Sequence, residues 1–600
     1  MNPPDSLDAG VERPAARLPR RTRFLVVLAV LSACAALIAA SWINGLVADP
    51  LSLLAEFYAV RSYWLAQIAA MLLGFALPHA AVLCLESGWP RVAAGWAAWL
   101  RRAAPAIACA GMCLFIYRYG NRQFGGYDHS IIVDVGWRLW NGQRPYVDFI
   151  CTLPPGFFLG IQYAFRWFGP AWNSQLILAG VFASLTFLWM YWLLERLLAA
   201  RLMAYVTALA VECTAILVAA FWWHNSIAST AACVFLLSCA YYIAAPASRS
   251  ALVSFALAAF LLALMKPNIA LPLELGGISI ALACAPGRKR LAAAMLLAAA
   301  GLYGFLVWNH VPLSGLVQSY ATAAADRGRV WNLIGIRNLR GWDFDIWVGC
   351  TAMLLLPAGL WVRRLQQVLR PLDLRAAGFW LAIGLGPVAA LLGFVSNLEI
   401  KFVDMAPLIC FGAVAAFGGP AAPNRQTLPG KPFDPFSVRY LACLCCVAAA
   451  ACCAGSARYR VAGIGNHSFF YWRDGGHQTG EPFFRDLRAS SRFRTVMAQV
   501  REATRGDAGQ SVFFGPRMEF EYAVCRLPSP KHLPIWWHPG SSYGLADERA
   551  VLAEWKNQSF DTLIFLKHDF SFYPPAFRDM LRTLYVTDDR YSELTVLHRM

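Results

Sequence analysis

The sequence predicts a mainly α-helical membrane protein. It would have a bundle of about 13 transmembrane spans, interfacial helices in its first large outer loop, and a small C-terminal α/β domain. Hydrophobic residues make up 58% of the 600 residues and charged residues only 14%, which is not the composition of a soluble protein. Apolar runs of roughly 16–23 residues recur along the chain, each long enough to cross a bilayer core. After residue 456 the runs shorten and charged residues become frequent.

The apolar runs predict the spans in chain order. Two of them are short and adjacent, which leaves the count open by one or two. We expect no cleaved signal peptide, because the first run lacks a small-residue cleavage site and more spans follow it. The predicted spans are 24–46, 63–85, 103–118, 174–194, 203–222, 225–245, 250–265, 269–284, 291–308, 346–362, 376–395, 406–420 and 440–456.

Basic residues predict the orientation. Alternate loops collect arginine and lysine, beginning with residues 1–23 and including the "RKR" at 288–290. The positive-inside rule makes these loops cytoplasmic, and it places the loops 119–173 and 309–345 and the region 457–600 outside. We therefore expect a multi-pass membrane protein with a cytoplasmic N-terminus and an extracytoplasmic C-terminal domain. Much of the net charge of +17 is an orientation signal, so no nucleic-acid partner is expected.

The region 457–600 predicts a small extracytoplasmic α/β domain. Helices are expected at 483–505, 546–558 and 576–583, and strands at 511–515, 560–566 and 593–599. The region has no nucleotide-binding loop and no Ser-His-Asp spacing. A domain that caps the membrane region is therefore favoured over a second active site.

The first outer loop, 119–173, carries the most unusual sequence, "FGGYDHSIIVDVGWRLWNGQRPYVDF" at 124–149. Residues 130–142 predict a short interfacial helix that Ser130 would cap and Gly142 would end. Asp134 and Arg138 stand four residues apart in it, which favours an ion pair over a catalytic role for Asp134. The following stretch, "LPPGFFLGIQYAFRWFG" at 153–169, predicts a second interfacial helix because it is too short for a span.

Asp128 is the candidate catalytic residue of this loop. It precedes the predicted helix, follows "FGGY", and has no cationic partner at helical spacing. A carboxylate near the membrane surface without such a pair is available for acid–base chemistry. Asp148, in "PYVDF", is a candidate substrate-binding residue, with a turn-forming or loop-holding role as the alternative.

The series "YDHS…GWRLWNGQRPYVDF…LPPGFFLGIQYAFRWFG" resembles the first outer loop of the GT-C superfamily of polytopic glycosyltransferases. It is similar to bacterial relatives of protein O-mannosyltransferases and lipid A aminoarabinose transferases. The specific match covers residues 124–169, and the general hydropathy plan covers most of 24–456, which would be the GT-C-like catalytic region. His129 stands where glutamate is common in the family, and two extra spans precede the loop.

This resemblance implies an integral membrane glycosyltransferase. Such enzymes transfer a hexosyl or pentosyl group from a polyprenyl-phosphate carrier to a hydroxyl of a cell-envelope glycan, lipid or protein. Asp128 matches the family's loop aspartate and would act as general base on that hydroxyl. The departing lipid phosphate would need cationic stabilisation. The resemblance implies no definite cofactor, and a role for a divalent cation stays open.

Two lysines are candidates for binding the lipid phosphate. Lys266, in "MKPN", lies at the outer junction of two short apolar segments, where snorkelling or a pair with Glu274 is the alternative. Lys401, in "NLEIKF", lies on a short outer turn, where a local pair with Glu399 is the alternative. The arginines of the loop 309–345 resemble those of the mobile outer loop that covers the donor in GT-C enzymes.

Three further residues are candidates for binding sugar or acceptor. His224 and Asn225 lie in "FWWHNSIAS", the outer turn between the fifth and sixth predicted spans. The alternative is an ordinary interfacial histidine. The third is His129, next to Asp128. Because the turn at 224 has no carboxylate, a two-acid mechanism or a metal there is not favoured.

Other interpretations stay open at this stage. A transporter or flippase would place ionisable residues within spans and often shows internal repeats, whereas these predicted spans are nearly free of charge and show no internal repeat. An O-antigen-type polymerase or ligase is kept open by the arginine-rich loop 309–345. Most of the 17 cysteines fall in predicted spans, but Cys151 and Cys525 fall outside, so a disulfide between them is a further alternative.

Overall fold

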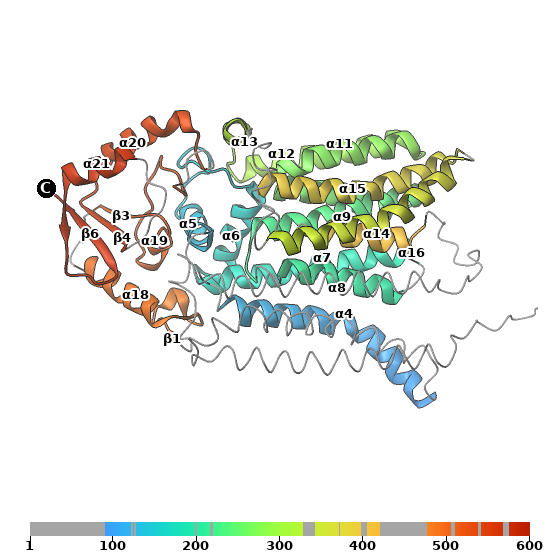
Figure 1. The fold of residues 1–600 in the computed structure, drawn as a ribbon, viewed down its shortest axis with the longest axis horizontal. Helices are drawn as coiled ribbons and strands as arrows, with labels where there is room; N and C mark the ends of the chain where they lie inside the picture. Colours follow the sequence, from blue (N-terminus) through green and yellow to red (C-terminus); the bar gives the residue numbers. More distant parts are fainter. Residues whose placement is uncertain are drawn as a thin grey trace, which may run out of the picture.

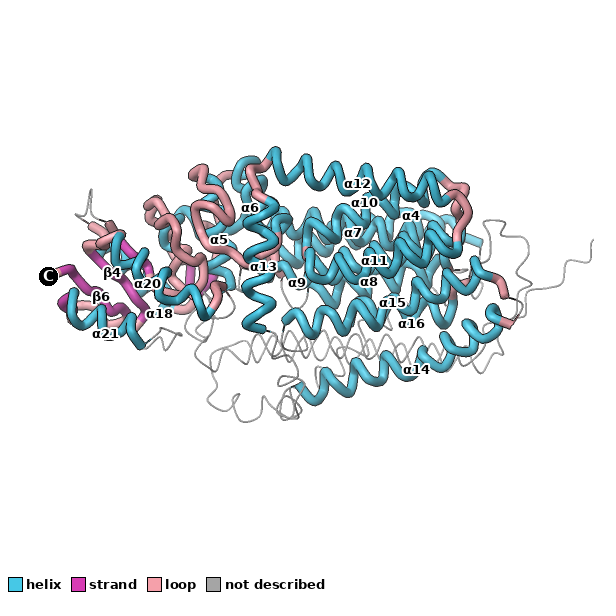
Figure 2. The backbone as a smooth tube through the Cα atoms, turned by 90° about the horizontal axis from the view of Figure 1, so that it is seen from above, coloured by secondary structure: helices cyan, strands magenta, loops and turns pink. Residues whose placement is uncertain are grey.

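The computed structural model consists of a long helical bundle with an α/β domain at one end. Helices α5 (Asp128–Trp140) and α6 (Pro155–Phe168) lie between the two parts (Figure 1). The perpendicular view shows the same order along the long axis (Figure 2). The structure describes residues 91–121, 124, 128–198, 201–216, 220–327, 343–370, 372–397, 405–419, 477–505, 511–537, 542–567 and 575–600.

The bundle helices follow the apolar runs. Among the described residues, five stretches are long and apolar enough to cross a membrane: α7, α9, α11, α12 and Leu374–Gly393 of α15. Shorter apolar helices lie beside them. The bundle comprises α4 (Arg91–Gly120), α7 (Trp172–Leu197), α8 (Arg201–Ile216), α9 (His224–Ala244), α10 (Arg249–Met265), α11 (Pro267–Cys284), α12 (Arg288–Trp308), α14 (Asp343–Leu369), α15 (Leu374–Asn397) and α16 (Ala406–Phe417).

Helix α9 is the centre of the bundle. Nearly all of its residues are buried, and it packs against α7, α10 and α15. Helix α12 is equally apolar, yet it leaves Leu296 and Leu297 more than 70% exposed. Helices that are apolar on every side are stable with such an exposed face when lipid covers it. The prediction of a polytopic membrane bundle is confirmed.

The predicted spans at 24–46, 63–85 and 440–456 lie outside the described residues. Most of the others coincide with a helix to within a few residues. The span predicted at 203–222 is too long, because α8 ends at Ile216 and residues 220–223 form a turn. In that turn the backbone N–H of Trp222 donates to Gln175 Oε1 at 2.7 Å, so a neighbouring side chain replaces the helical acceptor.

Both predicted loop helices form, but α5 begins earlier than expected. It starts at Asp128, so Ser130 lies inside the first turn and does not cap it. The predicted ion pair is present, with Arg138 Nε 2.6 Å from Asp134 Oδ2. Both of its side chains are buried, whereas an interfacial helix would expose its polar stripe. Helix α6 leaves Trp167 and Phe168 exposed at its end.

The C-terminal α/β domain contains a four-stranded sheet in the order β3-β4-β6-β5. Strands β3 and β4 are parallel, and the other neighbours are antiparallel. Aromatic residues fill one core, with Trp555 packed on Phe513, Phe560 and Phe577. The elements are β1 (His477–Gln478), β2 (Arg488–Ala489), α18 (Ser491–Ala503), β3 (Val512–Phe514), α19 (Glu521–Val524), α20 (Glu548–Asn557), β4 (Thr562–Leu566), α21 (Pro575–Leu584), β5 (Tyr585–Asp588) and β6 (Leu594–Arg599).

One predicted helix of this domain is wrong over its first turns. Residues 482–484 form a 3₁₀ turn, and the short strand β2 follows it. Helix α18 begins only at Ser491, because the side chain of Ser490 accepts a hydrogen bond from Phe493 N at 3.1 Å and caps the helix there. The sequence patterns also missed α19 and β5.

The packing of α5 on α6 gives a first prediction. A Cβ added at Gly136 would lie 2.4 Å from Ile161 Cγ2 and 2.9 Å from Phe165 Cε2. We expect overpacking in Gly136→Ala to lower the free energy of unfolding by about 1–3 kcal/mol. The higher helix propensity of alanine offsets about 1 kcal/mol of this loss. Thermal unfolding of the detergent-purified protein measures this. The control is Gly111→Ala, where a Cβ meets nothing within 4 Å; an equal Tm in both variants would contradict the packing.

Candidate functional site

The first turn of α5 carries the candidate base and a buried histidine. Asp128 is its first residue and His129 its second. The ring of His129 lies 4.2 Å from that of Phe221 and 5.7 Å from that of Trp172, measured between centroids. The histidine therefore joins α5 to the turn that precedes α9. This contact brings two segments together that are about 90 residues apart in the chain.

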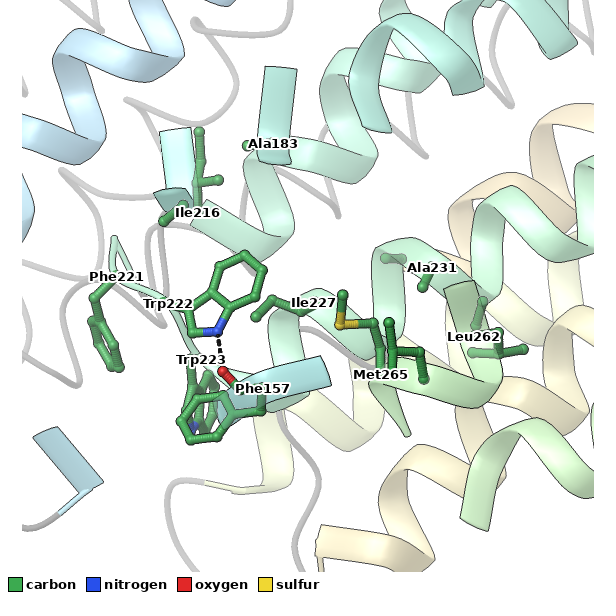
Figure 3. Packing of buried hydrophobic residues seen from close by; sticks show 14 of the residues in the cluster. Phe157, Ala183, Ile216, Phe221, Trp222, Trp223, Ile227, Ala231, Leu262 and Met265 are labelled. Carbon is green, nitrogen blue, oxygen red and sulfur yellow. Dashed lines mark hydrogen bonds between the residues drawn. The ribbon is translucent and has the colours of Figure 1, made fainter. Parts of the chain in front are cut away.

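The turn at 221–223 is held in place by α6 and α7. The indole N–H of Trp222 donates to the carbonyl of Phe157 at 2.8 Å, a bond drawn in Figure 3. A Cβ at Gly160 would lie 2.6 Å from the same indole, so only glycine allows this approach. A tryptophan whose polar atom and ring face are both engaged fixes the orientation of the residues that follow it.

The residues that follow the turn form a polar group with Lys266. His224 is the first residue of α9, and its ring packs edge-on against that of Phe157 at 5.5 Å. Asn225 and Lys266 are both 5% exposed, and Lys266 Nζ donates a hydrogen bond to Asn225 Oδ1. The structure therefore brings three predicted binding residues to one place, at the same end of the bundle as α5.

Lys266 occupies a break between two helices. It ends α10 and precedes α11, with φ −158° and ψ 83°, as expected from the two short apolar segments. The "PPG" of the outer loop packs on this break: a Cβ at Gly156 would lie 2.9 Å from Leu264 O and 2.7 Å from Met265 Sδ. The alternative pair with Glu274 does not form through Glu274 Oε1, which has no hydrogen-bond partner among the described residues.

Asp148 belongs to a different group. Its Oδ2 accepts hydrogen bonds from Arg144 N at 2.7 Å and Arg144 Nε at 3.2 Å, and Lys531 Nζ lies 3.8 Å from Oδ1. Burial alone would raise the pKa of Asp148. The bonds from Arg144 and the charge of Lys531 outweigh burial and lower it. These contacts match the loop-holding alternative, and substrate binding by Asp148 stays a prediction.

Lys401 and Glu399 lie outside the described residues. So do Arg329, Arg337 and Arg340 of the outer loop 309–345, while Leu313–Arg327 forms helix α13. Ser319 of α13 donates a hydrogen bond to the carbonyl of Cys151. Cys151 and Cys525 are both free thiols, so the disulfide alternative is wrong. Across the described ranges no cluster of three or more His, Cys, Asp or Glu could hold a metal ion.

A set of residues in the C-terminal domain lies against α5, and no sequence pattern indicated this contact. Ser130 Oγ donates to Glu519 Oε2 at 2.6 Å, and Ser529 Oγ donates to Asp134 Oδ1 at 2.6 Å. Burial, with a smaller contribution from the charge of Asp134, raises the pKa of Glu519 to about 8, although the hydroxyl of Ser130 acts in the opposite sense. Glu519 is therefore a neutral acid over much of the physiological range.

No protein-family model and no curated protein sequence matches this chain. The fold is similar to that of ArnT from Cupriavidus metallidurans bound to undecaprenyl phosphate, with 11% identity, a TM-score of 0.45, and coverage of 82% of this chain and 98% of that one. It is also similar to the Archaeoglobus fulgidus oligosaccharyltransferase in a complex with zinc and sulfate, with 10% identity, a TM-score of 0.41, and coverage of 77% and 67%.

At this identity and TM-score the activity of this chain does not follow from those of the two similar structures. The activity is therefore inferred from the residues of the site.

The buried carboxyl of Glu519 predicts a pH-dependent stability. Because its pKa is about 8 in the folded protein and near 4.5 ordinarily, the folded state binds the proton more tightly. Its stabilising contribution is full below about pH 4.5 and falls by at most about 1.4 kcal/mol per pH unit as the pH rises toward about 8.

Thermal unfolding of the detergent-purified protein across this interval measures that loss. Glu519→Gln cannot ionise and should show a smaller decline of Tm with rising pH. Part of the decline should remain, because burial also raises the pKa values of Asp134 and Glu521. Identical pH slopes in the two proteins would show that Glu519 does not titrate in this interval.

Proposed function

We propose that this chain is an integral membrane glycosyltransferase with Asp128 as general base. It transfers a sugar from a polyprenyl-phosphate carrier to a hydroxyl of a cell-envelope glycan, lipid or protein on the outer side of the bacterial inner membrane. The observation that carries the proposal is the group at one end of the bundle. There the first turn of α5 contacts the turn at 221–223, and the start of α9, which follows that turn, binds the buried Lys266 through Asn225.

The proposed reaction needs a base and a cation on opposite sides of the sugar. Asp128 takes the proton of the acceptor hydroxyl while the oxygen of that hydroxyl forms a bond to the anomeric carbon of the sugar. The bond from that carbon to the phosphate oxygen breaks, and its electron pair leaves with the lipid phosphate. A general base contributes roughly 10²–10⁴-fold to such a step. A cation placed where the phosphate charge develops lowers the barrier further.

Lys266 fits the role of that cation. A buried ammonium group at a helix break is costly in an apolar surround unless it serves a polar cavity or a partner. One of its contacts in the site is the hydrogen bond from its Nζ to the amide oxygen of Asn225, which is a neutral group. His129, His224 and Asn225 are proposed to bind the sugar or the acceptor. Lys401 and Asp148 are also proposed to bind substrate.

The role of Asp128 is tested by Asp128→Asn. This variant keeps the size of the side chain but cannot take a proton, so we expect sugar transfer to fall about 10²–10⁴-fold. Purified protein is given a polyprenyl-phosphate monosaccharide with a labelled sugar, and transferred label and released lipid phosphate are measured. The control is Asp579→Asn, an exposed acid in α21. Full activity of Asp128→Asn in a normally accumulating protein would remove the general-base role.

Lys266 is tested through the dependence on donor. If its ammonium group binds the lipid phosphate, Lys266→Ala should raise the apparent KM for the lipid donor at least about tenfold, as a lost charge-assisted bond predicts. The KM for the acceptor should change much less. Lys556→Ala, which removes an exposed lysine of α20, is the matched control. An unchanged donor KM in Lys266→Ala would refute phosphate binding by this residue.

A further inference from the structure

One row of side chains on α5 is bound by the C-terminal domain. Ser130, Asp134 and Arg138 are four residues apart, so they lie on one face of the helix. Ser130 binds Glu519, Asp134 accepts from Ser529, and Arg138 donates to the carbonyl of Pro530. The opposite side packs on α6 at Gly136. Helix α5 therefore contacts α6 on one face and the segment 519–530 of the domain on the other.

The contact at Ser130 is the one that reaches the first turn of α5. Its hydroxyl donates to Glu519 Oε2 at 2.6 Å and accepts from Phe520 N at 3.0 Å. Ser130 and Glu519 are buried, at 0% and 5% exposure. Ser130 is two residues from Asp128, whereas the contacts of Asp134 and Arg138 are one and two turns further along. The terminal turn of a helix frays most readily, so a buried bond there has the largest effect on its order.

We propose that Glu519 is a positioning residue: through Ser130 it holds the first turn of α5 and so orients Asp128 for proton transfer. This inference rests on the proposed function. It assigns the C-terminal domain a part in the reaction although the domain contributes no reacting group. Misplacing a catalytic group by about 1 Å can lower the rate about 10²-fold, so the loss of one positioning hydrogen bond can change the rate of transfer measurably.

The test removes each end of the bond. Ser130→Ala deletes the donor with little change in volume, and Glu519→Leu deletes the acceptor. We expect kcat to fall about 10–100-fold in both, with the donor KM largely unchanged. Glu519→Gln retains a side-chain oxygen that can accept from Ser130, so it should recover most of the rate. The control Glu593→Gln weakens the exposed pair with Arg492, 2.6 Å apart, elsewhere in the same domain.

A second readout does not depend on activity. Hydrogen–deuterium exchange of the full-length protein should be faster for the amides at the start of α5 in Ser130→Ala and Glu519→Leu. It should be unchanged in strand β4 and in the Glu593→Gln control. Unchanged exchange at the start of α5 in both variants would overturn the proposal, whatever reaction the chain catalyses.

A double variant separates this inference from the proposed function. If Glu519 acts through Asp128, Asp128→Asn with Glu519→Leu should be no less active than Asp128→Asn alone, because both changes disable one unit. Multiplied losses would overturn the positioning role while leaving Asp128 as the base. Faster exchange at α5 together with a fully active Asp128→Asn would instead refute the proposed function, and with it the purpose assigned to Glu519.

Discussion

The buried polar contact between α5 and the C-terminal domain is the constraint on which the rest of this end of the molecule depends. Removing Asp134 and Arg138 from water costs several kcal/mol per ion, and the cost is offset only when the pair is fully hydrogen-bonded. Ser529, the carbonyl of Pro530 and Gln143 complete those bonds. Separating the domain from α5 would leave a charge pair half satisfied. The domain and the outer loop therefore form one structural unit.

Features that depend on local sequence could be predicted. Apolar runs marked most helices because length and hydropathy are read within one segment, and the pair between Asp134 and Arg138 followed from helical spacing. The errors arose where a hydrogen bond or a contact that the apolar pattern does not show decides how a segment folds. The indole of Trp222 and its backbone N–H bind other helices, so the end of the apolar run predicted at 203–222 is not helical. Ser490 caps α18 where the apolar pattern alone continues the helix upstream.

The site could be predicted as a set of residue types but not as a set of contacts. A lysine at a break between apolar segments and a polar turn after aromatics are visible in the sequence, and both predicted a place near the membrane surface. Nothing in the sequence says that Asn225 accepts from Lys266, 41 residues away, or that Ser130 binds Glu519, 389 residues away. Such pairs are decided by how helices pack, and periodicity carries no information about that.

Helix α6 contacts both the helix break that contains Lys266 and helix α5, which carries the proposed base. Its first turn packs on the break at Lys266 through Gly156, and its next turns pack on α5 at Gly136 through Ile161 and Phe165. A helix is stiff along its axis, so one element sets the spacing between the proposed phosphate-binding lysine and the turn that carries the proposed base. Pre-set geometry of this kind lowers a barrier without any additional reacting group. The short "PPGFFLGIQYAF" segment therefore acts as a spacer, which explains why it contains glycine where it touches the break and bulky residues where it supports α5.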